Sequence, residues 1–338
     1  MLTSIGLGRA PAVAVGAAPA RDAQAHAAGP RLSLASDDRS PPRGSPSDAA
    51  PNNPFGPSRT GNIEREFLRV QRPAGVEVVR GHLERTCFPV HTHDEFTFCA
   101  IESGRARCLC GRSVCEAAPG SLVLLEPGVP HTGGSPDSTP VAYRTLHVPA
   151  GVLVQACAGR AVPTFPSKVV SDPDLAAAFI AMHTRLLTHP APEALAPELL
   201  GLLDRIVRRH GASVPPAPSE TREPRRVRVV REHLATNLRQ TTSLDELSDL
   251  VGVSPFYLQR TFKAVTRMSP REYQMDLRIR RARQLLREGL TPRAVASSVG
   301  FFDQSHFTRA FRRLTGVTPG QYVARPAGAD HQRRPGAA

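Results

Sequence analysis

The chain has 338 residues, which is long enough for two domains that each bury a hydrophobic core. Charged residues make up 22% of it and hydrophobic residues 40%, a composition typical of soluble globular proteins. No apolar run approaches the roughly 20 residues of a membrane-spanning helix. Met1 to Ala20 lack the basic and unbroken apolar regions of a secretory signal. We therefore expect a cytoplasmic protein that neither spans a membrane nor is secreted.

The positive charge is concentrated in the last third of the chain. Lys and Arg number 43 against 30 Asp and Glu, a net charge of +13 with His neutral. From Thr221 to the C-terminus there are 22 basic and 10 acidic side chains, so this segment carries nearly the whole excess. Such asymmetry predicts a polyanionic partner, either nucleic acid or an anionic membrane surface.

The six cysteines form no C-x-x-C pair, and a chain of this length does not need disulfides to fold. We interpret all of them as reduced thiols: Cys87, Cys99, Cys108, Cys110, Cys115 and Cys157. The three between positions 108 and 115 could sense thiols or metals. We favour the simpler interpretation that they are small buried hydrophobic residues.

Residues 1–62 are dominated by Ala, Pro, Gly, Ser, Asp and Arg. This composition cannot bury enough apolar area to offset the conformational entropy lost on ordering, so we expect a disordered tail. A misassigned start codon explains the same composition equally well. Residues 325–338 are expected to be a second disordered tail.

Residues 63–155 carry the pattern of short β-strands. Apolar and polar residues alternate in 96–101, and Ser103-Gly104 and Pro119-Gly120 are among the turn signals that follow. Alternation with regular turn signals predicts a small antiparallel β-barrel or sandwich.

Between residues 156 and 211 the apolar period becomes helical, as in Leu199, Leu202 and Ile206. Two helices are expected, over 172–187 and 192–210. They could simply pack on the barrel, or they could mediate dimerisation, which is the role we assign to them. The Pro-rich residues 212–222 are expected to form a stiff linker.

Residues 223–324 are helical throughout and carry explicit helix-start signals, which predict seven helices. Three pairs have the spacing of a capping box: Ser243 with Glu246, Ser269 with Glu272, and Thr318 with Gln321. Two further helices are expected to start at Ser254-Pro255 and Thr291-Pro292.

This helical segment contains an internal repeat. Five residues recur 49 positions later: Leu258, Arg260, Phe262, Pro270 and Tyr273 match Phe307, Arg309, Phe311, Pro319 and Tyr322. Upstream of the turn the offset is 48, since Leu244, Leu247, Val251 and Gly252 match Pro292, Val295, Val299 and Gly300. The second copy therefore has one extra residue in its turn. Each copy has the order helix, Gly-containing turn, helix, which is the pattern of a helix-turn-helix unit.

Helical spacing separates a buried face of each second helix from the face presented to DNA. In the first unit the presented residues are Phe256, Gln259, Arg260 and Lys263. In the second unit they are Ser305, Thr308, Arg309 and Arg312, and Gln304 and His306 are further candidates for DNA contact. Arg can bond guanine through two hydrogen bonds, Gln can do the same with adenine, and Phe can contact a thymine methyl group. The alternative for any one exposed Arg is a solvated helix face, but two Arg at equivalent repeat positions favour DNA contact.

Residues 223–324 resemble the DNA-binding domain of AraC/XylS transcriptional regulators. The resemblance rests on two stretches, Gly252-Val-Ser-Pro-Phe-Tyr-Leu-Gln-Arg-Thr-Phe-Lys263 and Gly300-Phe-Phe-Asp-Gln-Ser-His-Phe-Thr-Arg-Ala-Phe-Arg-Arg-Leu-Thr-Gly-Val-Thr-Pro319. It implies two units that bind successive major grooves on one face of promoter DNA, joined rigidly by a helix from Pro270 to about Arg287. One departure is Arg267, where the family usually has Gly, so we expect the first recognition helix to end differently from the second.

The strand-rich segment resembles the cupin-type effector domain common at the N-terminus of this family. Metal-binding cupins use two His, a nearby Glu and a later His, and here the position of the Glu is Thr97. We therefore predict no metal and no cofactor, with His91, His93 and His131 as the candidates if a metal does bind. We favour a pocket for a small-molecule effector, lined by His91, His93, Thr97, Cys99 and His131.

The sequence thus predicts an α+β multidomain protein. A cupin-like β-barrel (63–155) is followed by dimerisation helices (156–211), and an all-α domain (223–324) holds two helix-turn-helix units. We predict an effector-responsive transcriptional regulator and not an enzyme. Its expected partners are promoter DNA, RNA polymerase, a small-molecule effector and a second copy of the chain, in the cytoplasm at the nucleoid. The rivals are a cupin metalloenzyme fused to a DNA-binding domain, and an architectural nucleoid protein.

Overall fold

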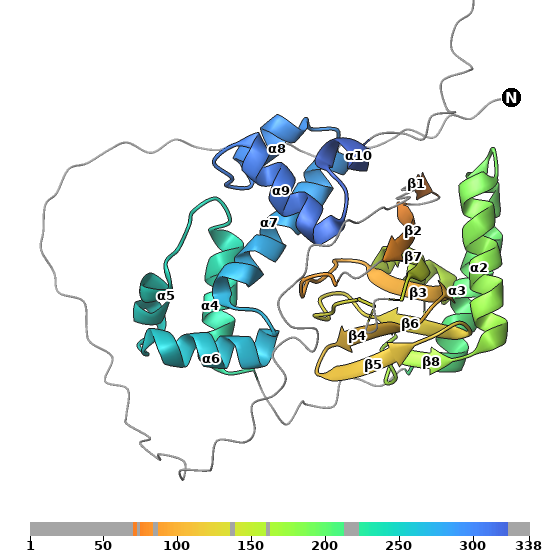
Figure 1. Cartoon of the computed structure of the whole chain (residues 1–338), viewed down its shortest axis with the longest axis horizontal. Helices are drawn as coiled ribbons and strands as arrows, with labels where there is room; N and C mark the ends of the chain where they lie inside the picture. The colour runs from red at the N-terminus through yellow and green to blue at the C-terminus, as the bar shows by residue number, and fades with distance from the viewer. Residues whose placement is uncertain are drawn as a thin grey trace, which may run out of the picture. The chain divides into compact units, whose positions relative to one another are not determined.

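The computed structural model describes residues 70–72, 75–83, 87–135, 139–159, 163–212 and 223–323. The expected tails 1–62 and 325–338 lie outside the described residues, as does the expected linker after its first residue, Ala212. The described part consists of a strand-rich segment followed by helices, as the sequence predicts (Figure 1).

Eight strands build the first part of the chain: β1 (Val70–Arg72), β2 (Val76–Leu83), β3 (Phe96–Ser103), β4 (Ala106–Cys110), β5 (Ser113–Ala117), β6 (Ser121–Leu125), β7 (Val141–Val148) and β8 (Val169–Ser171). Six of them form an antiparallel sheet in the order β1-β2-β7-β3-β6-β8, while β4 and β5 pair with each other. The sheet domain therefore takes its last strand from beyond residue 155.

The strand-rich, cupin-like fold that the sequence predicts is confirmed, and the described strands form two sheets and not a closed barrel. The two sheets are connected by isolated bridges, such as Cys110 with His131 and Arg107 with Gly134. Pro127 and Pro130 lie in the segment that makes these bridges. A proline has no N–H to donate to a ladder, so continuous pairing ends there.

Helices cover one face of the larger sheet (Figure 1). They are α1 (Ala150–Ala156), α2 (Pro173–Thr188), the 3-10 helix η1 (Pro192–Leu195) and α3 (Ala196–His210). Their apolar faces share one core with the sheet, in which Phe179 and Leu203 pack with Phe98. The two helices expected over 172–210 are confirmed, and their apolar faces are buried within the chain.

A buried histidine joins α2 to the sheet. The His183 side chain is fully buried, its Nε2–H donates to the Val79 carbonyl at 2.9 Å, and its Nδ1 accepts from Arg144 at 3.2 Å. Burial, together with the nearby Arg144 charge, lowers the pKa of His183 to about 4. Both ring nitrogens are satisfied only when the imidazole is neutral.

We expect acid to destabilise this contact. The unfolded chain takes up a proton at His183 near pH 6.5, whereas the folded chain resists it down to about pH 4. Between these values the unfolded state binds more protons, so the free energy of unfolding falls with falling pH, by about 3 kcal/mol for this group. Urea unfolding followed by circular dichroism from pH 7 to pH 4 measures the slope. The His183→Gln variant should show a smaller slope, and an unchanged slope would contradict the assignment.

Seven helices follow, as expected from their start signals. They are α4 (Arg225–Thr236), α5 (Leu244–Val251), α6 (Pro255–Thr266), α7 (Pro270–Arg287), α8 (Pro292–Ser298), α9 (Gln304–Thr315) and α10 (Pro319–Val323). Capping boxes form at α5 and α7, where the Ser hydroxyl accepts from the N–H of N3 and the Glu carboxylate accepts in return. Thr318 and Gln321 make the same pair of bonds at α10.

Two helix-turn-helix units with separate cores result from the repeat. The first core packs α4 to α6 around Leu258 and Phe262, and the second packs α8 to α10 around Phe307 and Phe311. Helix α7 contributes to both, through Tyr273 in the first core and through Ile279, Ala282, Leu285 and Leu286 in the second.

The expectation that the two recognition helices end differently is wrong. Arg267 takes the left-handed conformation with φ of 64°, and its N–H bonds the Lys263 carbonyl. Gly316 does the same in the second copy, with φ of 85° and a bond to Arg312. The Schellman-like end therefore forms despite the side chain, at the cost of about 1 kcal/mol of backbone strain.

The glycines of the two turns differ in the space around them, and this gives a stability prediction. Both have positive φ, 65° at Gly252 and 83° at Gly300. A Cβ at Gly300 would lie 2.5 Å from the Arg239 carbonyl oxygen, whereas one at Gly252 would meet nothing within 4 Å. Gly252→Ala should therefore lower the free energy of unfolding by about 1 kcal/mol, the conformational term alone. Gly300→Ala should cost more than twice as much in urea unfolding, and equal losses would contradict the packing.

Candidate DNA-binding helices and effector cavity

Helix α6 presents the first set of expected DNA-contact residues. Ser254 caps it by accepting from the Tyr257 N–H, and Leu258 and Phe262 anchor its inner face. Gln259 and Arg260 are exposed, Lys263 is half-buried, and the Phe256 side chain is 76% exposed. The Arg260 guanidinium lies 5.9 Å from the centre of the Phe256 ring, a cation–π contact that holds both side chains on the outer face.

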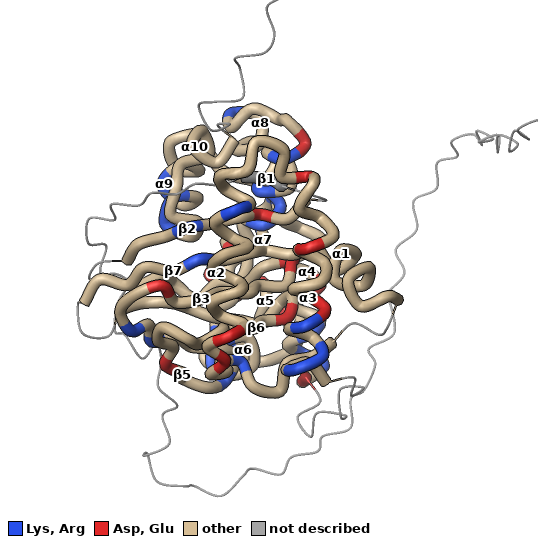
Figure 2. The backbone as a smooth tube through the Cα atoms, turned by 90° about the vertical axis from the view of Figure 1, so that its right-hand side faces the viewer, with Lys and Arg blue, Asp and Glu red and all other residues tan. Residues whose placement is uncertain are grey.

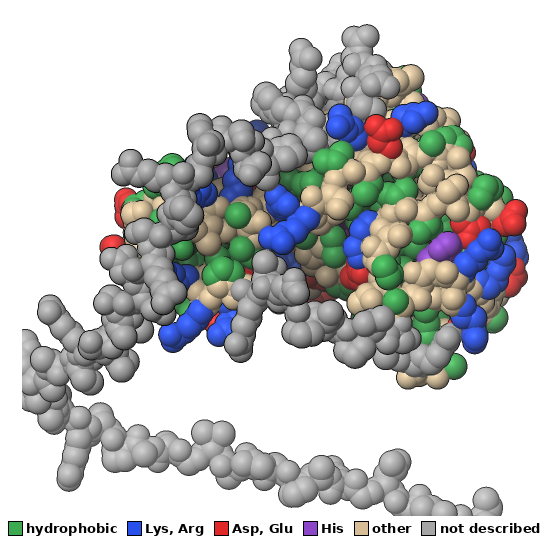
Figure 3. Space-filling view, turned by 90° about the horizontal axis from the view of Figure 1, so that it is seen from below, with side chains coloured by type: hydrophobic (Ala, Val, Ile, Leu, Met, Phe, Trp, Pro, Cys, Tyr) green, Lys and Arg blue, Asp and Glu red, His purple; other side chains and the backbone are tan. Residues whose placement is uncertain are grey.

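Helix α9 presents the second set in the same way. Asp303 caps it by accepting from the His306 N–H at 2.6 Å, while Phe307 and Phe311 are fully buried. The expected contact residues Gln304, Ser305, His306, Arg309 and Arg312 are exposed, and Thr308 is half-buried. The backbone tube shows the cations of this helix on a short stretch of chain (Figure 2). Lys and Arg side chains also occur among hydrophobic and neutral ones on the face drawn in Figure 3.

One exposed aromatic residue was missed by the sequence reasoning. Phe302 is 96% exposed and lies in the turn before α9, directly after the buried Phe301. It occupies the place of the extra residue in the second copy of the repeat. That insertion was the available signal, because a residue without a counterpart in the first copy has no place in the shared core.

A cavity of about 160 Å³ opens into the sheet domain between the two sheets. All five residues expected in an effector pocket line it: His91, His93, Thr97, Cys99 and His131. Most of the remaining sheet-domain lining is apolar, including Val79, Leu125 and Val141. The lining also includes α7 residues such as Ile279 and Arg283, which the sequence did not suggest.

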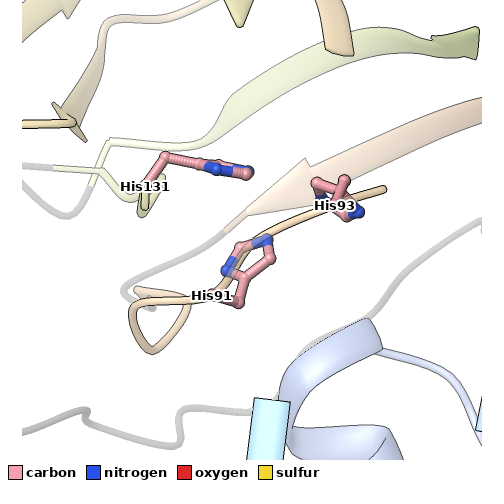
Figure 4. Close-up of side chains that lie close together, drawn as sticks. All are labelled: His91, His93 and His131. Carbon is pink, nitrogen blue, oxygen red and sulfur yellow. The ribbon is translucent and has the colours of Figure 1, made fainter. Parts of the chain in front are cut away.

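Three of the lining histidines, His91, His93 and His131, lie close together (Figure 4). His91 and His131 lie opposite each other and exchange backbone hydrogen bonds of 3.0 and 3.1 Å, which brings their ring centres to 4.3 Å. The His93 ring centre is 5.0 Å from each of them. One nitrogen from each ring lies within 4.8 Å of the others, which is close enough for a shared ligand.

The rings of His91 and His131 are each held in place by a hydrogen bond from Nδ1 to a backbone carbonyl. Nδ1 of His91 bonds the Pro89 carbonyl and Nδ1 of His131 bonds the Val129 carbonyl, both at 2.9 Å. Burial lowers the pKa of His131 to about 3, and it lowers that of His93 well below its usual value, assisted by the neighbouring His147 and Arg283. His93 and His131 are therefore neutral near pH 7.

The cysteines near the cavity behave as buried hydrophobic residues. All six are free thiols, and Cys99, Cys108 and Cys110 line the cavity. Burial raises the pKa of Cys99 to about 11, so it carries no thiolate at neutral pH. The Cys110 pKa is lowered by a hydrogen bond from Cys108.

Helix α7 closes one side of the cavity with a buried charge cluster. The Arg283 guanidinium donates to the Glu77 carboxylate at 3.0 Å and to His93 Nδ1 at 2.9 Å. Arg287 donates to Glu77 at 3.0 Å and to Glu95 at 2.7 Å. Both carboxylates belong to the sheet domain and are almost fully buried, with 2% and 6% exposure. Because the acids precede their arginines by about 190 residues or more, no local pattern predicts this pairing.

A second contact lies about two turns earlier on the same helix. Asp276 is buried and accepts from the backbone N–H of Thr92 at 3.0 Å and from its hydroxyl at 2.5 Å. Arg280 pairs with Asp94 in the same loop. Burial raises the pKa of Asp276, although Arg280 and Thr92 oppose the shift. The loop that carries two of the three cavity histidines, residues 91–94, is therefore fixed directly to α7.

Two family models match the chain. The AraC-like ligand binding domain matches residues 73–203, and a helix-turn-helix domain matches residues 247–325. The first match includes the helices α2 and α3 together with the sheets. Among the described residues, no helix combines the length and apolar character that crossing a membrane requires.

The relatives of this chain include several transcriptional regulators. The uncharacterized HTH-type regulator YbfI of Bacillus subtilis is 30% identical over 229 residues, which cover 65% of this chain and 81% of YbfI. RipA of Corynebacterium glutamicum is 37% identical over 132 residues, 39% of this chain and 37% of RipA. Of the solved structures, fatty-acid-bound wild-type ToxT from Vibrio cholerae aligns over 74% of this chain and 95% of its own, with 12% identity and a TM-score of 0.44. The chain therefore belongs to the AraC family of transcriptional regulators, with a ligand-binding domain followed by a double helix-turn-helix domain.

Proposed function

We propose that α6 and α9 enter successive major grooves on one face of promoter DNA, through the ten residues that the repeat singles out. The observation that carries this proposal is the equivalence of Arg260 and Arg309, which occupy the same position in the two copies and are both exposed. Each lies on a helix whose inner face is anchored by two buried aromatic or aliphatic residues. Chance exposure explains one such arginine more readily than two.

Helix α7 supports this spacing. It has 18 residues, which span about 27 Å at the usual rise per residue. One turn of DNA is about 34 Å, so two units joined by this helix lie at a distance of the right order. Arg260, Arg309 and Gln259 would contact base edges, whereas Arg313 and His306 would contact phosphates or flanking positions.

The effector site of this proposal is the cavity with the three histidines. An apolar body with a few polar groups at one end is the usual form of a small-ligand site. The same residues could in principle support a cupin metalloenzyme. We favour a non-enzymatic sensor because YbfI, whose match covers most of its length, is named as a regulator. On this proposal the protein acts in the cytoplasm, at the nucleoid.

A homodimer and contact with RNA polymerase complete the proposal. The apolar faces of α2 and α3 are used in the core, so a dimer through these helices would be made by their outward, polar faces. The exposed pair of Arg185 with Glu198 connects the two helices on that side. Equilibrium sedimentation of the full-length protein, with Arg185→Glu as the variant, tests the dimer.

Removal of either recognition arginine should weaken binding to the cognate site. Arg260→Ala and Arg309→Ala are each expected to cost about 1–3 kcal/mol, since a bidentate base contact is lost. Fluorescence anisotropy on duplexes from upstream of its own and neighbouring genes, at two salt concentrations, measures this loss.

A matched control is Arg105→Ala, which removes an exposed cation of the sheet domain that pairs with Glu116. This variant should bind every duplex as the parent protein does. If the two recognition-helix variants also bound the preferred duplex normally, the assignment of the DNA-contacting face would be wrong. Equal binding of the parent to all duplexes would favour an architectural protein.

A further inference from the structure

The hydrogen bonds of two of the three histidines fix which ring nitrogen carries the proton. Because Nδ1 of His91 and of His131 faces a backbone carbonyl, that nitrogen must carry the ring proton. The unprotonated nitrogen of both rings is then Nε2. A backbone carbonyl on one nitrogen and a lone pair on the other is the arrangement found around histidines that bind metals.

The rest of the cluster suits a cation with nitrogen ligands. Three imidazoles, each with a nitrogen within 4.8 Å of the others, match the ligand type and number of tri-histidine sites for Zn²⁺ and neighbouring ions. Thr97, which stands where metal-binding cupins have Glu, lies 3.1 Å from Nδ1 of His147. The His147 ring packs on the His93 ring with a centre distance of 4.2 Å. Thr97 and His147 therefore position the His93 ring without being candidate ligands themselves.

His93 differs from the other two because its Nδ1 accepts a hydrogen bond from Arg283 of α7. A neutral imidazole has one lone pair in the ring plane. A metal on Nδ1 would take that lone pair directly. A metal on Nε2 would move the ring proton to Nδ1, where it would face the N–H of the guanidinium. Either coordination removes the acceptor that Arg283 uses.

We propose that His91, His93 and His131 bind one divalent first-row transition-metal ion, and that this ion competes with Arg283 for the lone pair of His93. The ion is then the effector of the regulator, which departs from the sequence-based prediction of no metal. This inference rests on the proposed function for its consequence, a change in DNA binding, but the metal site itself does not depend on DNA. Through Arg283 the ion loosens the contact of α7 with the sheet domain.

The metal site is tested with Co²⁺, whose visible absorption reports its ligands. Chelator-treated full-length protein is titrated with CoCl₂ and is expected to bind one equivalent with a d–d band. His91→Ala and His131→Ala should each weaken binding at least tenfold. The control His189→Ala removes a histidine at the end of α2, away from the cavity, and should bind as the parent does. No binding, or equal binding by all variants, would overturn the site.

Folding of the variants is checked by circular dichroism and by their affinity for the preferred duplex. For any variant that fails to fold, the conservative His131→Gln replaces it, because glutamine can still donate to the Val129 carbonyl but does not offer an imidazole nitrogen. This variant is expected to keep its fold and to lose the Co²⁺ band. Retention of the band would overturn the site.

Competition with Arg283 is tested by a matched pair of charge removals. Arg283→Met should tighten Co²⁺ binding at least fivefold, because the competitor for His93 is gone. Arg287→Met removes an equal charge from the same Glu77 and Glu95 carboxylates without touching His93, and should tighten it much less. Equal tightening by the two variants would show a simple charge effect and would overturn the competition.

The consequence for DNA distinguishes this inference from the proposed function. Saturating Co²⁺ should change the affinity for the preferred duplex at least fivefold, and a chelator should reverse the change. Metal binding with no effect on DNA affinity would overturn the role of the ion as effector. Sequence-specific DNA binding by a protein that binds no metal would overturn the inference and leave the proposed function intact. Metal binding without preference for any duplex would instead contradict the proposed function.

Discussion

The arrangement of the described chain depends on helix α7, which contacts both helix-turn-helix cores and the sheet domain. Its first half packs in the core of the first helix-turn-helix unit, and its second half packs in the core of the other. Its polar face supplies Asp276, Arg280, Arg283 and Arg287 to the sheet domain. One helix therefore connects the two helix-turn-helix cores and also lines the cavity of the sheet domain.

The contact between α7 and the sheet domain is ionic and buried, which has a specific physical consequence. Two guanidinium groups and two carboxylates lose most of their hydration here, and their mutual attraction largely offsets that cost. Such a cluster contributes little net stability, yet loss of one member leaves a buried charge uncompensated. Small changes at its edge, such as a change in the acceptor at His93, can therefore shift the balance between docked and undocked states of α7.

Much of the helical half could be predicted from the sequence because its signals are local. Ser243, Ser269 and Thr291 each act within one turn of chain, and the self-match fixes two units without reference to anything distant. The strand half was less predictable, since alternation places Thr97 and Cys99 on one face but does not say whether strands close into a barrel. The prolines at 127 and 130 decide that point, and their effect depends on partners that the pattern does not reveal.

The candidate site residues likewise divide into those that a local sequence pattern reveals and those that only the structure reveals. Arg260 and Arg309 could be found by helical spacing, and the five cavity residues by spacing in strands and by resemblance. Arg283 and Glu77 could not, because α7 carries several arginines with no local feature that distinguishes a buried one. Phe302 could be noticed in the sequence only as the extra residue of the second repeat. Its exposure depends on the path of the turn before α9, which the repeat does not reveal.

The most direct test of the central claim, that α7 holds two recognition helices in register with DNA, is hydroxyl-radical footprinting of the full-length protein on its preferred promoter fragment. The account predicts two protected patches on one face of the duplex, with centres about 10 base pairs apart. A single patch, or protection spread evenly along the fragment, would contradict it.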